Sequence, residues 1–123
     1  MNLKQIITAK NSGFRTKKIR VEKWGVAVTI REPLHTDFNR YIKTIKDITD
    51  NEKLTDHEKD LLNIKAEATL FATVLLDDNG DFVFSNDIDD LVKSYGPVHT
   101  RLVNEAFNLL GLKSEPIKEA EKK

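Results

Sequence analysis

The stretch VEKWGVAVTIREP, from Val21 to Pro33, contains two runs of alternating apolar residues joined by a Lys-Trp-Gly corner. Alternation with a period of two, in segments rich in valine and isoleucine, is typical of β-strands that bury one face. Ile19 continues the pattern upstream, and Pro33 ends it because proline has no backbone N–H to donate to a sheet. We therefore predict a β-hairpin at residues 17 to 31. We expect Trp24, at its corner, to pack its ring onto the helices that follow.

Downstream of the hairpin, apolar residues recur every three or four positions, which predicts helices. Four helices are expected, near residues 36 to 48, 56 to 75, 86 to 95 and 97 to 110. Thr36 or Asp37 is the expected N-cap of the first, and the polar residues 49 to 53 are expected to form a loop. Thr55 and Glu58 have the spacing of a capping box at the start of the second helix.

The sequence signals at the ends of these helices are less regular. The apolar run LFATVLL, residues 70 to 76, fits either the end of a helix or a strand, because periodicity does not separate the two in short apolar runs. Gly96 and Pro97 are expected to end one helix and open the next, with proline at the first helical position. Gly111 is the expected C-cap of the last helix.

The stretch DDNGDFVFSNDIDD, residues 77 to 90, is rich in aspartate and invites a calcium-loop interpretation. An EF-hand loop needs oxygen ligands at its first and twelfth positions and glycine at its sixth. With Gly80 sixth, Leu75 falls first and Asn86 twelfth, so two essential ligands are missing. The stretch instead predicts an Asp-Asn-Gly turn and then a helix capped by Ser85 or Asn86, whose acidic first turn complements the helix dipole.

The composition points to one ordinary globular unit. The chain has 123 residues, no cysteine, and 20 basic against 20 acidic residues. A disulfide framework and a thiolate metal site are thereby excluded. No apolar run is long enough to span a bilayer, and the first residues lack the apolar centre of a signal peptide, so we expect a cytosolic protein without a membrane partner. We predict a flexible or short helical lead-in at 1 to 16, a single domain at 17 to 112, and a mobile charged tail at 113 to 123.

Catalytic and nucleic-acid-binding patterns are weak in this chain. His35, His57 and His99 have no spacing that links them to a nucleophile, and the scattered glycines form no phosphate-binding loop, so we expect no enzyme, no metal site and no cofactor. The basic residues between Lys10 and Lys23 leave open a basic-arm nucleic-acid binder, but no known recognition motif accompanies them. This interpretation therefore ranks low.

The order of these elements resembles that of a known family. A Trp24-Gly25 corner lies between two alternating strands. The helices follow, then the DDNGDFVFS turn, and finally NLLGL at residues 108 to 112. In this order the chain resembles the tail assembly chaperones of long-tailed, siphovirus-type bacteriophages, over roughly residues 15 to 112. Lys23 stands where a proline is expected in that family. The fold we predict is α+β and mostly helical, with the N-terminal β-hairpin packed against about four helices.

The resemblance implies a non-enzymatic protein of the host cell cytoplasm that is absent from the mature virion. Such a chaperone would bind the tape measure protein, keep it soluble, self-associate into a homo-oligomer, and promote polymerisation of the tail tube around it. A small structural or connector subunit of a virion remains the alternative. The expected partner-binding surface is an apolar helical stripe, assigned to Leu61, Ile64, Ala68, Phe71, Val103 and Phe107. Filling of the monomer core is the competing explanation for each of these residues.

The resemblance also implies a second, longer form made by a programmed frameshift, which would recruit the major tail tube protein. Glu121, Lys122 and Lys123 could be encoded by GAA AAA AAG, an A-rich run on which a ribosome can slip back by one base. A charged C-terminus that simply stays solvated is the other interpretation. We expect the tail to make few contacts under either one.

Overall fold

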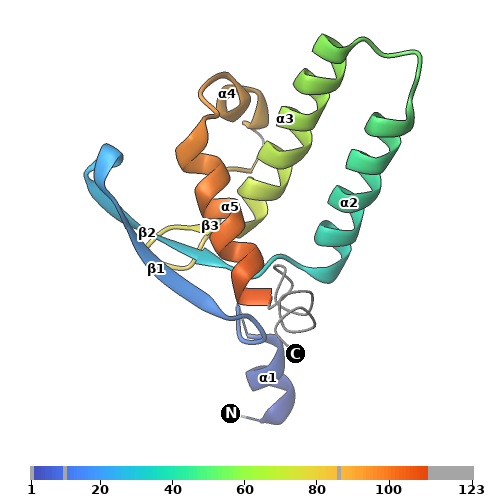
Figure 1. The fold of residues 1–123 in the computed structure, drawn as a ribbon. Coiled ribbons are helices and arrows are strands. Elements are labelled where there is room, and N and C mark those ends of the chain that lie inside the picture. The colour runs from blue at the N-terminus through green and yellow to red at the C-terminus, as the bar shows by residue number, and fades with distance from the viewer. Residues whose placement is uncertain (1, 10, 86, 111–123) are drawn as a thin grey trace, which may run out of the picture.

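The structure, a computed structural model, describes residues 2–9, 11–85 and 87–110. Within these residues it is α+β and mostly helical, as predicted, and it has five α-helices and one three-stranded sheet (Figure 1). In chain order the elements are α1 (Leu3–Thr8), β1 (Thr16–Val21), the 3-10 turn η1 (Glu22–Trp24), β2 (Val26–Arg31), α2 (His35–Asp50), α3 (Asp56–Val74), β3 (Leu75–Leu76), α4 (Ile88–Lys93) and α5 (Pro97–Leu110).

The predicted hairpin is confirmed. Strands β1 and β2 pair antiparallel, with Ile19 opposite Val28 and Val21 opposite Val26. The chain reverses through η1 and then Gly25, whose φ of 68° lies in the left-handed region that glycine adopts at little cost. Its N–H donates to the Val21 carbonyl oxygen at 2.9 Å, which closes the corner.

A third strand extends this sheet and was only half anticipated. Strand β3 pairs antiparallel with β2, placing Leu76 opposite Thr29 and Leu75 opposite Ile30. Helix α3 therefore stops at Val74, so the strand interpretation of residues 70 to 76 holds for the last two residues alone. Both leucines are buried and both gain a strand partner in β2, a tertiary stabilisation that local propensity cannot show.

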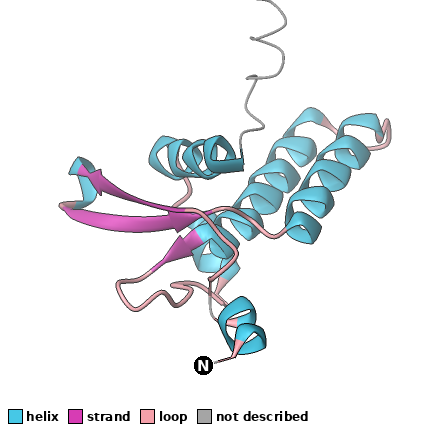
Figure 2. Ribbon diagram, turned by 90° about the horizontal axis from the view of Figure 1, so that it is seen from below, coloured by secondary structure: helices cyan, strands magenta, loops and turns pink. Residues whose placement is uncertain are grey.

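The core lies between the sheet and the helices. Helix α5 lies between the β1–β2 hairpin and α3, while α2 packs on the far side of α3 (Figures 1 and 2). The fully buried large side chains come from the hairpin, α3, α4 and α5, and from Pro33 after β2: Val21, Ile30, Pro33, Phe71, Val74, Leu91, Leu102 and Val103. A stripe of small and large apolar residues on α3 thus meets both α5 and the sheet.

The ends of α2 differ from the prediction. The helix begins at His35, one residue before the expected start, and its N-cap is Leu34 rather than Thr36 or Asp37. Leu34 is extended, with φ −59° and ψ 146°, and the helix begins directly after it, with no side-chain cap. The helix also continues to Asp50, past the expected end at residue 48, so the predicted loop at residues 49 to 53 begins later. Ion pairs one turn apart support the extension, at Lys43–Asp47 and Lys46–Asp50.

Helix α4 is shorter than expected. It spans Ile88–Lys93 instead of residues 86 to 95, and its N-cap is Asp87 rather than Ser85 or Asn86. The Asp87 carboxylate turns back and accepts the backbone N–H of Ser85 at 3.0 Å, which holds a turn in front of the helix. The helix ends at Lys93, and Ser94 is its C-cap, with its N–H donating to the Leu91 and Val92 carbonyl oxygens.

Other predicted helix ends are confirmed. The capping box forms, with Thr55 Oγ1 accepting the Glu58 N–H and the Glu58 carboxylate accepting the Thr55 N–H. Helix α5 opens at Pro97, as expected. The predicted Gly111 cap and the charged tail lie outside the described residues.

An arginine ties the lead-in to the rest of the fold. Arg31, on β2, is buried, and its guanidinium stacks on the rings of Phe14, at 4.0 Å, and Phe82, at 4.9 Å. It donates to the Thr73 carbonyl oxygen and to Asn11 Oδ1, and burial lowers its pKa. Helix α1, within the lead-in, lies beyond this contact and has no buried residue.

Candidate partner-binding surface

Helices α2 and α3 form an antiparallel pair whose far half stands clear of the sheet (Figure 1). The C-terminal half of α3 is buried by α4, α5 and the sheet, whereas its N-terminal half packs mainly on α2. Three large apolar side chains of that half are exposed: Leu61 by 51%, Leu62 by 40% and Ile64 by 37%. On α2, Ile42 is 49% exposed. Large apolar residues gathered on one element in this way mark interaction sites more often than isolated ones do.

Ile42, Leu61, Leu62 and Ile64 are called the patch below. A groove runs between α2 and α3, and of these four residues Leu62 lines it. Its volume is about 320 Å³, and its floor is mostly apolar, formed by Tyr41, Ile48, Leu62, Ala66 and Leu70. Asp37, Arg40 and Lys65 line its rim. An apolar floor with charges at the edge is the arrangement that receives an amphipathic helix in other proteins.

The fold divides the six residues predicted to bind a partner. Leu61 and Ile64 are exposed and belong to the patch. Ala68, Phe71 and Val103 are buried in the core, each at most 1% exposed, so this monomer does not present them at its surface. Phe107 is half-buried, and its ring contacts Phe38 at 5.3 Å. One apolar stripe in the sequence therefore serves both the core and the surface, because α3 is longer than the layer that covers it.

A buried aromatic cluster explains the role of Trp24. The ring of His99, on α5, lies 5.2 Å from Trp24, 4.7 Å from Tyr95 and 5.2 Å from Phe71. Trp24 therefore packs from the hairpin corner onto the helices, as predicted, although 38% of it remains exposed. The Gly96 N–H donates to His99 Nδ1 at 3.0 Å, and burial lowers the pKa of His99. Burial also raises the pKa of Tyr95, with Glu67 adding to the effect.

Comparisons with known proteins agree with this architecture. A family model described as phage tail assembly chaperone matches residues 2–123. The chain belongs to the phage tail assembly chaperone family. A solved structure titled "Structure of bacteriophage HK97 tail assembly chaperone" matches with a TM-score of 0.70 and 36% sequence identity, covering 88% of this chain and 96% of that one. A search among curated proteins gives no significant match. The family's role lies in phage assembly and is not catalytic.

Two residues of the chaperone's exposed patch were missing from the predicted site, Leu62 and Ile42. Both had a signal in the sequence, because each lies in an apolar stripe at helical spacing. The sequence did not show at which residue of α3 burial by α5 ends. The two helices also differ in charge. On α2, lysines and aspartates form ion pairs with one another, whereas the first turn of α3 carries the acidic residues Asp56 and Glu58.

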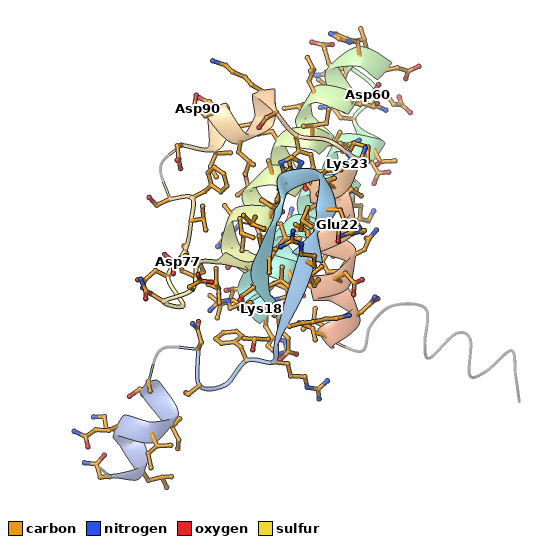
Figure 3. The ribbon with its side chains drawn as sticks, turned by 90° about the vertical axis from the view of Figure 1, so that its left-hand side faces the viewer. Lys18, Glu22, Lys23, Asp60, Asp77 and Asp90 are labelled. Carbon is orange, nitrogen blue, oxygen red and sulfur yellow. The ribbon has the colours of Figure 1, made fainter. Side chains whose placement is uncertain are left out.

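The basic hairpin of the chaperone is partly neutralised by its own fold. Lys17 forms an ion pair with Glu105 at 3.0 Å, and Arg15 donates to the Leu109 carbonyl oxygen. Lys18 and Lys23 remain on the outer side of the hairpin, with Glu22 between them (Figure 3). The remaining basic surface is therefore smaller than the sequence suggested.

His35 and His57 are exposed, while His99 belongs to the aromatic cluster. Among residues 2–9, 11–85 and 87–110, no group of three or more histidine, aspartate or glutamate side chains is placed to hold a metal ion. No helix in the same ranges is long and apolar enough to cross a membrane.

Proposed function

We propose that this chaperone binds the tape measure protein, keeps it soluble, and promotes polymerisation of the tail tube around it. The observation that supports this is the apolar α2–α3 groove, which Leu62 lines, together with the exposed side chains of Leu61, Ile64 and Ile42 on the same two helices. A long helical protein exposes apolar stripes until the tube encloses it, and such stripes aggregate unless a partner covers them. The patch and groove offer a helix of that kind an apolar face at which to bind.

Many copies of the chaperone act together in this proposal. Each copy covers only a short length of helix, so its own affinity is modest. Copies that also self-associate along one tape measure chain gain strength from multivalency, because each added copy binds at a high effective concentration. Release is then straightforward, since a polymerising tube displaces the weak contacts one copy at a time.

Co-expression of the chaperone with the tape measure protein of its phage tests this proposal. The variants Leu61→Asn and Ile64→Asn, separately and together, are expected to reduce the soluble fraction of tape measure protein and the amount recovered with the chaperone. Leu3→Asn is the matched control, because Leu3 is 70% exposed on a different element, α1. Equal loss from the control, or no loss from the double variant with its fold intact by circular dichroism, would contradict the proposed surface.

We also propose a longer form of the chaperone, made by a minus-one frameshift, that recruits the major tail tube protein. Both forms would act in the host cell cytoplasm and be absent from the mature virion. The gene tests the first point, since an A-rich slip site near the codons for Glu121 to Lys123 must be followed by an open minus-one frame. Mass spectrometry of purified particles tests the second. Detection of this protein in stoichiometric amounts in the particles would favour the alternative, a structural or connector subunit of the virion.

A further inference from the structure

The sheet of this chaperone has an unfilled position beside β2. On β2, strand β3 reaches only Thr29 and Ile30, and its other side bridges Phe82 through Leu76. Within the described residues the first half of β2, Val26 to Val28, therefore has a strand neighbour on the β1 side alone. Continued past Leu76, β3 would run next to these residues. The chain instead leaves at Asp77, whose carboxylate accepts the N–H groups of Asn79 and Asp81 and bends the backbone away.

A groove of about 590 Å³ occupies this position. Along one wall lie Val26, Ala27 and Val28 of β2, and along the other lie Val83 and Phe84. The floor and ends of the groove are lined by Trp24, Phe71, Leu75, Leu76, Asp77, Asp78, Ser94 and His99. Several lining side chains are solvent-exposed, Val26 by 50% and Val83 by 47%. None of its lining residues lines the α2–α3 groove.

The backbone of β2 faces this groove with hydrogen-bonding groups. Glu32 donates its N–H to the Arg15 carbonyl oxygen on the β1 side, at 3.0 Å. Because bonding direction alternates along an antiparallel strand, even-numbered residues of β2 bond to β1 and odd-numbered ones face the other way. The paired Thr29 and Leu76 fit this alternation. The N–H and C=O of Ala27 therefore point into the groove, where an added strand would meet them.

The charge of the groove selects among extended segments. Asp77 and Asp78 line the end nearest β3, and Asp78 is exposed. Figure 3 shows Asp77 and Asp90 along the same side of the hairpin. A segment that runs antiparallel to β2, in the direction of β3, enters beside these carboxylates and ends at Trp24. A lysine or arginine at its first position would thus meet acidic groups, and alternating valine-like residues would meet the apolar floor.

We propose that this groove binds an extended segment of a partner protein as an additional strand on β2, with a basic residue first and β-branched apolar residues at alternate positions after it. Such a segment supplies the two backbone hydrogen bonds that Ala27 lacks a strand to make. It also covers the exposed parts of Val26, Val83 and Trp24. The proposal does not depend on the tape measure assignment, which concerns another surface.

The full chain and a synthetic peptide test this. Trp24 is the single tryptophan of the chain and lies at one end of the groove, so its emission reports occupancy. The probe is the acetylated and amidated peptide Lys-Thr-Val-Thr-Val, which contains no tryptophan and places its first threonine opposite Ala27 when the lysine lies opposite Val28. A saturable change in Trp24 emission below about 1 mM peptide is expected. The same peptide with an N-methyl group on its first threonine, the residue opposite Ala27, or with glutamate in place of lysine, should bind more weakly.

Protein variants make the test specific. Asp78→Lys should weaken binding of the lysine peptide about two- to five-fold, as loss of an exposed ion pair does, and should strengthen binding of the glutamate peptide. Ala27→Pro removes the N–H that faces the groove and should abolish binding. The Leu61→Asn, Ile64→Asn double variant is the control and should bind the peptide as the unmodified chain does, so failure of either proposal is recognised separately.

Three results would overturn the proposal. One is the absence of saturable binding up to about 1 mM. Another is equal binding of the N-methylated peptide, which would show that no strand is added. The third is a change in Trp24 emission on dilution of the chaperone alone, which would show that a second copy already occupies the groove.

Discussion

Replacing Phe71 by alanine separates core residues from surface residues along the apolar stripe of α3. The Phe71 ring is fully buried and packs on Phe84, Tyr95 and His99, with centroid separations of 6.4, 5.9 and 5.2 Å. Truncation of a buried phenylalanine removes its transfer free energy and leaves a cavity, which together lower the free energy of unfolding by about 3–5 kcal/mol. Leu61, ten residues earlier, is 51% exposed, so Leu61→Ala should cost less than about 1 kcal/mol.

Urea unfolding, followed by circular dichroism and by Trp24 emission, measures both variants. For a small domain the free energy falls by about 1–3 kcal/mol per molar urea, so Phe71→Ala should lower the midpoint by roughly 2 M and Leu61→Ala by less than about 0.5 M. Phe71→Leu, which keeps most of the volume, should fall between them. Similar midpoints for Phe71→Ala and Leu61→Ala would refute the division of the stripe into a covered and an uncovered half.

Three further predictions concern the corner, the capping box and the buried histidine. Gly25→Ala should lower the free energy of unfolding by about 1 kcal/mol, as measured by urea unfolding, because φ is positive there while an added Cβ meets no atom within 4 Å. An unchanged midpoint would contradict this. Thr55→Ala should lower the free energy of unfolding by about 1 kcal/mol, because the N-cap hydrogen bond is lost. The hydrogen bonds between Thr55 and Glu58 lower the pKa of Glu58 from its ordinary value of 4.5. The stabilisation by the capping box should therefore be present above pH 4.5 and be lost as pH falls through the lower pKa of the folded state. A pH series of thermal unfolding on both chains checks this, and parallel curves would count against it. Burial lowers the pKa of His99 from 6.5, so the unfolded state binds its proton more readily and stability should decrease as pH falls below that value. His99→Asn, whose amide oxygen can still accept the Gly96 N–H, should lose this dependence between pH 5 and 7, and retention of the full slope would assign it to another group.

Local signals were sufficient where an element is determined by its own residues. The alternation around Trp24 and Gly25 located the hairpin to within one residue, because period two and a glycine corner suit no other regular structure. The spacing of Thr55 and Glu58 located the start of α3, because both halves of a capping box lie within four residues. The family resemblance rested on the same kind of signal, the order of these elements along the chain.

The N-caps of α2 and α4 were predicted less well, because several polar side chains lie near the start of each helix. Asp37 is a good N-cap by type, but the helix begins two residues earlier, at His35, and Asp37 instead forms an ion pair with Arg40 in the first turn. The Asp87 carboxylate accepts the N–H of Ser85, which holds a turn before the helix, and α4 begins only after Asp87. In both places several side chains were able to satisfy the same backbone groups, and the tertiary course of the chain selected one.

The sequence by itself determined the element types, the hairpin, the mostly helical class and the apolar stripe of α3, because each depends on residues within a turn or two of one another. Only the tertiary structure decided which part of that stripe is covered. Ala68 and Phe71 are buried because α5 and the sheet reach them, while Leu61 and Ile64 stay exposed because α3 extends past that layer. It also decided that Leu75 and Leu76 form a strand and that β2 keeps an open edge beside them. Burial and strand pairing are relations between distant segments, so no local pattern encodes them.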